Sequence, residues 1–137
     1  MPGNTTTGGV LEQMILPALT RGGYIARSQI ITGVRPGGRP HKVDAVAEKS
    51  GEAIIISLKW QQSSGTAEQK VPFEVMCLAD AVRANLAARA YLVLGGPGWT
   101  LRDFFTSGAL KQHLVHANLV RVVSLEEFIG AANSGKL

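Results

Sequence analysis

The side chains of this sequence that could act together chemically lie in two neighbouring strand-like runs. Side chains two positions apart on a strand share one face of a sheet, so Ser57, Lys59 and Gln61 line up together. With Asp44 from the preceding run, that face carries a carboxylate, a hydroxyl, an amine and an amide. Burying such groups within an Ile-rich strand costs free energy unless they are paired or bind something, which favours a functional site.

A short turn at residues 50–51 would fix how the two runs pair. Counting outward from a two-residue turn places Asp44 directly opposite Ser57, with Lys59 diagonally across from Asp44. The same register puts Lys42 opposite Lys59, which is unfavourable unless an anion or a metal-bound phosphate lies nearby. The alternative is an ordinary ion pair between Asp44 and Lys59 on a half-exposed hairpin, which contributes about 0–1 kcal/mol.

Asp44, followed by a hairpin return to Ser57-Leu58-Lys59, resembles the motif of the PD-(D/E)XK nuclease superfamily. The order of elements around it, with a leading helix, is similar to that superfamily's core over most of the chain. The motif departs at two places: His41-Lys42-Val43 precede the aspartate where the name would put a proline, and Ser57 stands at the second acidic position. The resemblance implies a restriction-endonuclease-like α/β fold and a Mg²⁺-dependent DNA endonuclease that leaves 5′-phosphate and 3′-hydroxyl ends.

A serine at the second acidic position removes one charged metal ligand, so a carboxylate is expected from elsewhere. Some restriction enzymes of the superfamily have Ser-x-Lys here and take the acid from the following helix. Glu74, in the first turn of the helix expected after the motif, is our first candidate, and Glu68 is its rival. In the alternative interpretation, Glu74 only complements the helix dipole. Glu12 matches a further acidic residue that many relatives bring near the metals, or it is a surface glutamate.

The chemistry of such a site follows from charge. A phosphodiester repels nucleophiles, so its hydrolysis needs a cation on the non-bridging oxygens and a more basic water. With the resemblance, Asp44, Glu74 and the Leu58 carbonyl are the expected oxygen ligands of Mg²⁺, for which Mn²⁺ would substitute. Lys59 would orient the attacking water and stabilise the developing negative charge. Gln61 would continue the polar face toward a water or phosphate.

Basic side chains are concentrated ahead of the motif. The sequence Gly33-Val-Arg-Pro-Gly-Gly-Arg-Pro40 predicts a mobile loop with two arginines, which could follow a phosphate backbone. The alternative is an ordinary solvated loop. The expected DNA-binding residues are Arg35, Arg39, His41 and Lys42.

The elements that must position these residues follow from hydrophobic periodicity. Pro17 is expected to kink or stop the first helix. Pro72 is expected to open the helix over residues 72–88, and Ser124 to cap the last helix. The order αβββαβαβα predicts an α/β fold with a central mixed β-sheet flanked by helices, in one domain of residues 10–137 after flexible residues 1–9. The expected helices are 10–19, 72–88, 101–116 and 124–132, and the expected strands are 24–32, 41–48, 53–61, 90–94 and 119–123.

Bulk properties set the frame for function. In 137 residues, 45% are hydrophobic and 18% charged, which is typical of a globular chain, and the net charge is +4. The single cysteine cannot form an internal disulfide, and we find neither a signal peptide nor a membrane span, so an intracellular, cytoplasmic protein is expected. One compact core cutting both strands of a duplex needs two active sites, so we expect a homodimer.

Several functions stay open at this point. The leading one is a structure-specific DNA endonuclease, similar to Holliday-junction resolvases or repair enzymes. A small restriction or homing endonuclease that reads bases from the arginine loop is the runner-up. A non-catalytic DNA-binding module on the same fold is kept open by Ser57, and a metal-dependent RNase or nucleotide hydrolase is the third class.

Overall fold

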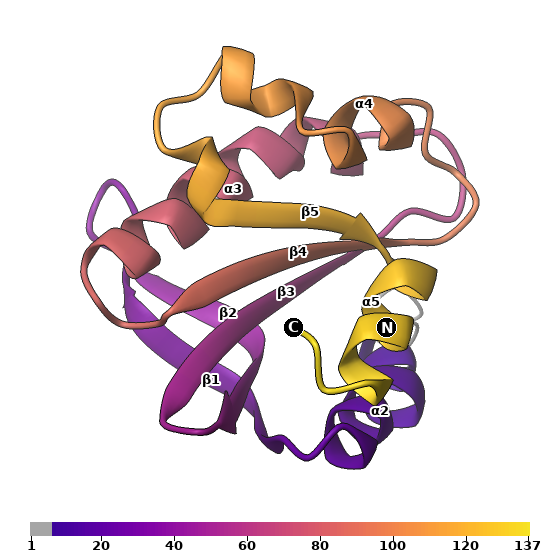
Figure 1. Ribbon diagram of the computed structural model, residues 1–137. Helices are drawn as coiled ribbons and strands as arrows, with labels where there is room; N and C mark the ends of the chain where they lie inside the picture. Colours follow the sequence, from indigo (N-terminus) through magenta and orange to yellow (C-terminus); the bar gives the residue numbers. More distant parts are fainter. Residues whose placement is uncertain (1–6) are drawn as a thin grey trace.

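The computed structural model describes residues 7–137, in which one five-stranded mixed sheet runs through the molecule (Figure 1). The strands are β1 (Ile25–Val34), β2 (Pro40–Lys49), β3 (Glu52–Trp60), β4 (Arg89–Gly95) and β5 (Val120–Ser124), and they are adjacent in chain order. β1–β2 and β2–β3 are antiparallel, whereas β3–β4 and β4–β5 are parallel. This confirms the predicted α/β fold with a central mixed sheet.

The β2–β3 hairpin has the register that the sequence predicts. Ser50 and Gly51 have φ angles of 54° and 80°, as a two-residue turn with left-handed backbone at both positions requires. The ladder runs from the Lys49–Glu52 pair to the Ala45–Ile56 pair and ends there. The two strands therefore stop pairing one position before the residues expected to do chemistry.

The β1–β2 ladder is also irregular beside the same position. Its pairs continue on both sides of Gln29 and Asp44 but omit these two residues, and Gln29 has a φ of 56°. A non-glycine residue in left-handed backbone is uncommon and is found preferentially at functional sites. Asp44 is thus at a break in the hydrogen bonding on both sides of β2.

The first helix is longer than predicted. Residues 7–10 are helical and continue into η1 (Leu11–Ile15), which is π-helical, and α2 (Leu16–Arg21). Pro17 does not stop the helix, because it lies in the first turn of α2, directly after the π-helical turn. The flexible terminus predicted at residues 1–9 is helical over 7–9, and residues 1–6 lie outside the described part of the chain.

The long helix α3 (Ala67–Arg83) begins five residues earlier than predicted, so Pro72 lies inside it rather than at its start. Its end is also earlier than predicted, since Asn85 adopts a φ of 61°. Leu86, expected in the apolar face of this helix, is consequently 47% exposed. The earlier start matters for function because it adds one more turn of helix beside the sheet.

The prediction of a single helix over residues 101–116 is wrong. The segment forms three short pieces, α4 (Arg102–Thr106), η2 (Ala109–Gln112) and η3 (Ala117–Leu119). Gly108 and His116 have φ angles of 87° and 67°, and each interrupts helical backbone. The last helix, α5 (Leu125–Asn133), confirms the expected cap, because Ser124 Oγ accepts a hydrogen bond from the Glu127 N–H at 3.1 Å.

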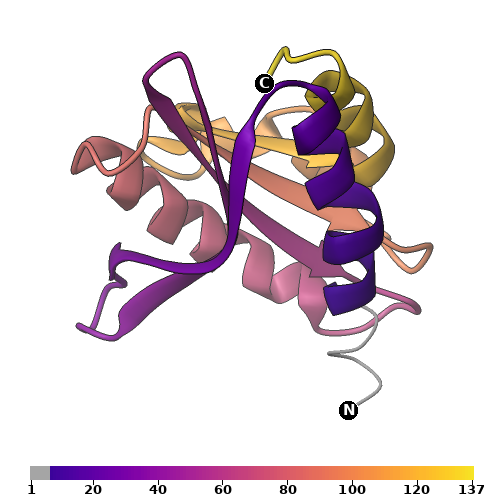
Figure 2. The ribbon, with the colours of Figure 1, turned by 90° about the horizontal axis from the view of Figure 1, so that it is seen from below.

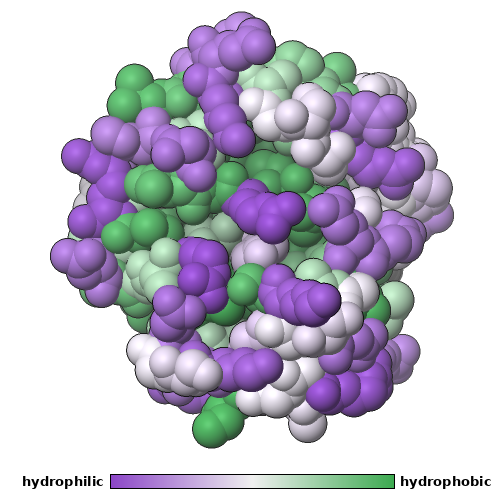
Figure 3. Space-filling model, in the orientation of Figure 1, coloured by the Kyte–Doolittle hydropathy of each residue, from purple (hydrophilic) through white to green (hydrophobic). Residues whose placement is uncertain are grey.

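The sheet has a hydrophobic core on each face. Ile54, Ile56 and Leu58 pack with η1, α2 and α5 on one side, and Ile55 packs under α3 on the other. Figure 2 shows this layering and the bend that carries the far end of β1 and β2 beside α3. Hydrophilic and hydrophobic side chains are interspersed over the face in Figure 3. Within residues 7–137, no helix combines the length and the apolarity needed to cross a membrane.

Candidate active site

A polar pocket of about 650 Å³ opens where β2 and β3 separate, between the first helix and α3. It gathers most of the residues that the sequence analysis singled out. Those lining it are Lys42, Asp44, Ser57, Leu58, Lys59 and Glu74. Residues 30 positions apart in the chain are thus brought to one place by the hairpin and the helix that follows it.

Asp44 is fixed by the backbone of the neighbouring strand. Its Oδ2 accepts a hydrogen bond from the Leu58 N–H at 2.7 Å. This N–H lies beyond the last β2–β3 pair, so the carboxylate takes the place of a strand carbonyl. Burial raises the pKa of Asp44 above its usual value, and the Leu58 hydrogen bond and the Lys59 ammonium offset only part of that effect.

Glu74 reaches the position of the absent second acid. Ser57 Oγ donates a hydrogen bond to Glu74 Oε2 at 2.6 Å, and His41 Nε2 lies 3.0 Å from the same oxygen. Glu74 is only 8% exposed because it lies on the buried face of α3, next to Val75. Burial acts to raise the pKa of Glu74, but the hydrogen bonds from His41 and Ser57 outweigh it and leave this pKa lowered.

The two carboxylates share an arrangement that suits a hard cation. Among the described residues, no donor reaches Asp44 Oδ1 or Glu74 Oε1, whereas the other oxygen of each is hydrogen-bonded. Each side chain is therefore held by one oxygen and keeps the second for the pocket. Two carboxylate oxygens beside a strand carbonyl are the kind of ligands that Mg²⁺ takes in proteins, so the residues present fit the metal that the sequence analysis expected.

Lysines provide the positive charge of the pocket. Lys59 is half-buried, and Lys42 and Lys70 are exposed at its edge. Lys70 was missed by the sequence analysis because the helix was expected to begin after it. With the true start of α3, Lys70 stands one turn before Glu74, at a spacing that puts both on one side of a helix.

Gln61 does not continue the polar face. β3 ends at Trp60, so the two-residue alternation that predicted this position no longer applies to Gln61. Its Nε2 donates to Gly98 O at 2.9 Å and to Glu68 Oε2 at 3.2 Å, and its Oε1 accepts the Ala67 N–H at 3.1 Å. The amide joins two loops to the start of α3 instead of lining the pocket.

The other two acidic candidates also lie outside the pocket. Glu68 Oε2 and Oε1 accept the N–H groups of Thr100 and Leu101 at 2.8 and 3.1 Å, and Thr100 Oγ1 donates to both oxygens at 2.7 Å. Both Glu68 oxygens therefore accept hydrogen bonds that hold the segment after β4. Glu12 is exposed on η1 and is not among the residues that line the pocket.

The predicted DNA-binding residues separate into two groups. His41 is 2% exposed and hydrogen-bonded to Glu74, so the prediction that it contacts DNA is wrong. The expected mobile loop is a tight turn that closes the β1–β2 hairpin, with the Arg35 N–H donating to Arg39 O at 2.7 Å. The Arg35 guanidinium lies over the Phe73 ring at 5.8 Å, and Arg39 and Lys42 are exposed.

Cys77 completes the surroundings of Glu74. It lies one turn further along α3 and is 1% exposed. Burial, with the charge of Glu74 adding to it, raises the pKa of the Cys77 thiol to about 11. The side chain is therefore a protonated thiol at neutral pH, which rules against a nucleophilic role.

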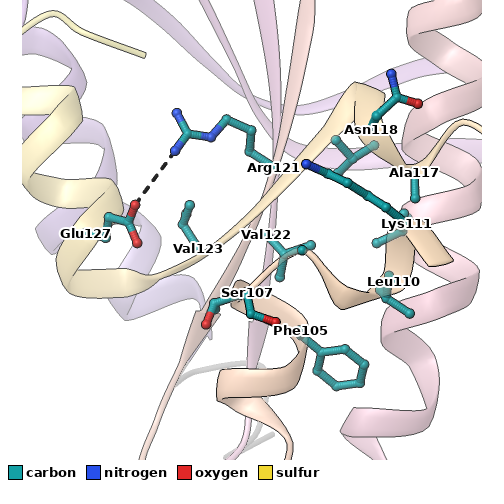
Figure 4. A pocket seen from close by; sticks show the side chains of 14 residues that line it. Phe105, Ser107, Leu110, Lys111, Ala117, Asn118, Arg121, Val122, Val123 and Glu127 are labelled. Carbon is teal, nitrogen blue, oxygen red and sulfur yellow. Dashed lines mark ion pairs between the residues drawn. The ribbon is translucent and has the colours of Figure 1, made fainter.

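A smaller pocket of about 190 Å³ lies on the opposite side of α3, between α4, η2 and β5 (Figure 4). Its charged side chains are Lys111, Arg121 and Glu127, and Arg121 pairs with Glu127 at 3.8 Å. Both partners of this ion pair are more than half exposed. It has a single carboxylate already opposite a guanidinium, so the larger pocket is the better candidate for catalysis.

Comparison with known proteins agrees with this fold. A family model described as a PD-(D/E)XK nuclease superfamily domain matches residues 3–136, and the chain therefore belongs to this superfamily. The resemblance drawn from Asp44, Ser57 and Lys59 is thereby confirmed at the level of the superfamily.

Similarity to individual proteins is weak. Among solved structures, the crystal structure of a protein of unknown function, AF1548, aligns with 80% of this chain at 12% identity and a TM-score of 0.49. The chain spans about half of that protein, 54% of its length. No curated protein matches the sequence.

Proposed function

We propose that this chain is a Mg²⁺-dependent DNA endonuclease that leaves 5′-phosphate and 3′-hydroxyl ends. The observation that carries the proposal is the 2.6 Å hydrogen bond between Ser57 Oγ and Glu74 Oε2. It supports the proposal because it holds a carboxylate from α3 against Ser57, the residue that stands at the second acidic position of the motif. Asp44, Lys59 and this carboxylate line one pocket, which cleavage requires and DNA binding alone does not.

Each residue of the pocket has a distinct role in this proposal. Asp44, Glu74 and the Leu58 carbonyl would hold the metal ion, and Mn²⁺ would be able to replace Mg²⁺ there. When bound, the cation neutralises the phosphate charge and makes a bound water more acidic. Lys59 orients the attacking water and stabilises the negative charge that develops on the phosphate. Ser57 and His41 fix Glu74 Oε2, which leaves Oε1 for the metal.

The substrate follows from the distribution of positive charge. Lys42 and Lys70 flank the pocket, and Arg35 and Arg39 lie at the hairpin tip beside α3. These side chains suit contacts with phosphates on both sides of a scissile bond. The tight turn that contains Arg35 and Arg39 offers few side chains for contacts with base edges. We therefore favour a structure-specific enzyme of the resolvase or repair type over a restriction or homing enzyme. Cutting both strands then calls for a homodimer.

A cleavage assay tests the proposal. The protein is incubated with a four-way DNA junction, with linear duplex and with single-stranded RNA, each with Mg²⁺ and with a chelator. We expect Mg²⁺-dependent nicks in the junction, and Asp44→Asn and Lys59→Ala should each cut at least about 100-fold more slowly. Arg121→Ala, at the smaller pocket, is the matched control and should cut normally. Equal cutting by Asp44→Asn and the wild type would contradict the assignment.

A further inference from the structure

Three buried side chains around Glu74 form a group with mixed ligand atoms. His41, Glu74 and Cys77 each place one ligand atom within 4.8 Å of the other two. Their exposed fractions are 2%, 8% and 1%. Within residues 7–137, no other three His, Cys, Asp or Glu side chains converge in this way.

The fold brings these ligands together in a favourable arrangement. Glu74 and Cys77 are three residues apart on α3, so their side chains lie on the same side of the helix. His41 comes from β2 and faces them across the gap between the sheet and the helix. Two ligands one turn apart on a helix, with a third from another element, is a common way to bind a metal ion.

The ligand atoms differ in kind from those of the proposed Mg²⁺ site. An imidazole nitrogen and a thiolate sulfur are ligands that Zn²⁺ prefers and that Mg²⁺ avoids. Zn²⁺ also requires a fourth ligand, and Glu74 is the member of the group that lines the pocket, where water can reach it. The pocket therefore offers a way in for the ion as well as room for the fourth ligand.

We propose that His41, Glu74 and Cys77 form a second metal site, selective for a thiophilic divalent cation of the Zn²⁺ type. On binding, the Cys77 thiol proton is released to solvent and the sulfur becomes a metal ligand. The hydrogen bond between His41 and Glu74 is broken, because both atoms turn to the ion. Glu74 then no longer completes the Mg²⁺ site, so Zn²⁺ inhibits cleavage; this last step rests on the proposed function.

The binding step is tested with Co²⁺, which substitutes for Zn²⁺ and shows a near-ultraviolet charge-transfer band only when a thiolate coordinates it. Cys77 is the only cysteine of the sequence, so a thiolate-to-cobalt charge-transfer band in the near ultraviolet reports this one side chain. We expect the band on titrating the wild type with Co²⁺ and its loss when Zn²⁺ is added. Cys77→Ala should show no band, and His41→Gln should weaken Co²⁺ binding at least about tenfold. A wild type without the band, folded by circular dichroism, would overturn the site.

The inhibition step is tested separately. Micromolar Zn²⁺ is added to the junction-cleavage assay in millimolar Mg²⁺, with wild type and Cys77→Ala in parallel. We expect wild-type cleavage to fall at least tenfold and Cys77→Ala to be unaffected, with equal cleavage by the two proteins before Zn²⁺ is added. Equal inhibition of both would overturn the inhibitory role. If neither protein cuts at all, the proposed function fails, while the cobalt band still decides whether the metal site exists.

Discussion

Two glutamates of α3 are buried to the same extent and have different surroundings. Glu68 and Glu74 are each 8% exposed. Both oxygens of Glu68 accept hydrogen bonds, from Thr100, Leu101 and Gln61, so its charge is fully used inside the protein. Glu74 is held through Oε2 alone. The exposed fraction therefore does not distinguish a structural carboxylate from one that can bind a ligand. The number of its oxygens that already accept hydrogen bonds does.

The two glutamates also differ in the groups that set their pKa values. Hydrogen bonds from the Thr100 backbone and side chain lower the pKa of Glu68. Burial acts to raise the pKa of Glu74, but the hydrogen bonds from His41 and Ser57 together outweigh it and lower this pKa, and the Glu74 charge helps to raise the pKa of Asp44. Such repulsion between neighbouring carboxylates is relieved when a cation binds between them.

The largest effect that separates the two glutamates is on catalysis. Glu74→Gln should slow Mg²⁺-dependent cleavage by about 10³-fold or more, because the metal supplies several kcal/mol of transition-state stabilisation. Glu68→Gln should cut at close to the wild-type rate but unfold at a lower temperature, since it loses the charge that holds Thr100 and Leu101. Cleavage rates and thermal melts of the two variants measure this. The reverse pattern would mean that Glu68 is the catalytic carboxylate.

A smaller effect is expected from moving the carboxylate back to the motif. Ser57→Glu in the Glu74→Ala background places an acid on β3 itself. The space that the Glu74 side chain leaves accommodates it. We expect cleavage about tenfold above that of Glu74→Ala alone, a coupling of about 1.4 kcal/mol in a double-mutant cycle. Ser57→Glu with Glu74 still present should not gain activity, because two carboxylates would then compete for one position. An inactive double variant that is folded and still binds DNA would count against the migrated acid.

The part of this site that could be predicted depended on regular secondary structure. The hairpin was predictable because Ser50-Gly51 fixes a two-residue turn and the alternation of side chains then fixes the register to Ala45–Ile56. Glu74 was expected in the first turn of the next helix, which is wrong, because α3 begins at Ala67 and Glu74 lies about two turns into it. Its place at the edge of the apolar face of that helix followed from the periodicity alone. These inferences needed only local chain geometry.

The residues that were missed depend on tertiary contacts or on the exact ends of elements. His41 was expected at the DNA because it stands beside Lys42, although it shares the strand face of buried Val43, two positions away. Gln61 was expected in the pocket because β3 was extended by one residue. The helix predicted over 101–116 failed at Gly108, whose cost in a helix of about 1 kcal/mol relative to alanine was underestimated.

The raised pKa of Asp44 gives a pH dependence. The carboxylate must be ionised to bind a cation, so metal affinity is present above this pKa and is lost as the pH falls through it. Because burial raises the pKa, the loss should occur at a higher pH than for an ordinary aspartate. Lys59→Met removes an ammonium that lowers this pKa, and should move the midpoint further toward neutral pH. Mn²⁺ affinity measured against pH tests this, and identical midpoints in both proteins would contradict it.

The smallest effect is expected at the hairpin tip, where Arg35 and Arg39 lie outside the pocket. Arg35→Ala together with Arg39→Ala should weaken DNA binding and reduce the slope of log K against log salt by about 0.9 for each lost phosphate contact. The rate at saturating DNA should stay within a few-fold of wild type, because neither side chain lines the pocket. An unchanged slope would place the DNA elsewhere on the surface.

We propose that Asp44 and Glu74 bind one metal ion through Oδ1 and Oε1, the carboxylate oxygens that no donor of the described residues reaches. A crystal soaked in Mn²⁺ and measured for anomalous scattering tests it most directly, with Glu74→Gln crystals as the matched control. We expect a single strong peak within coordination distance of Asp44 Oδ1 and Glu74 Oε1, and its disappearance in Glu74→Gln. A peak bound to Glu68, or one at Asp44 that survives the loss of the Glu74 charge, would contradict it.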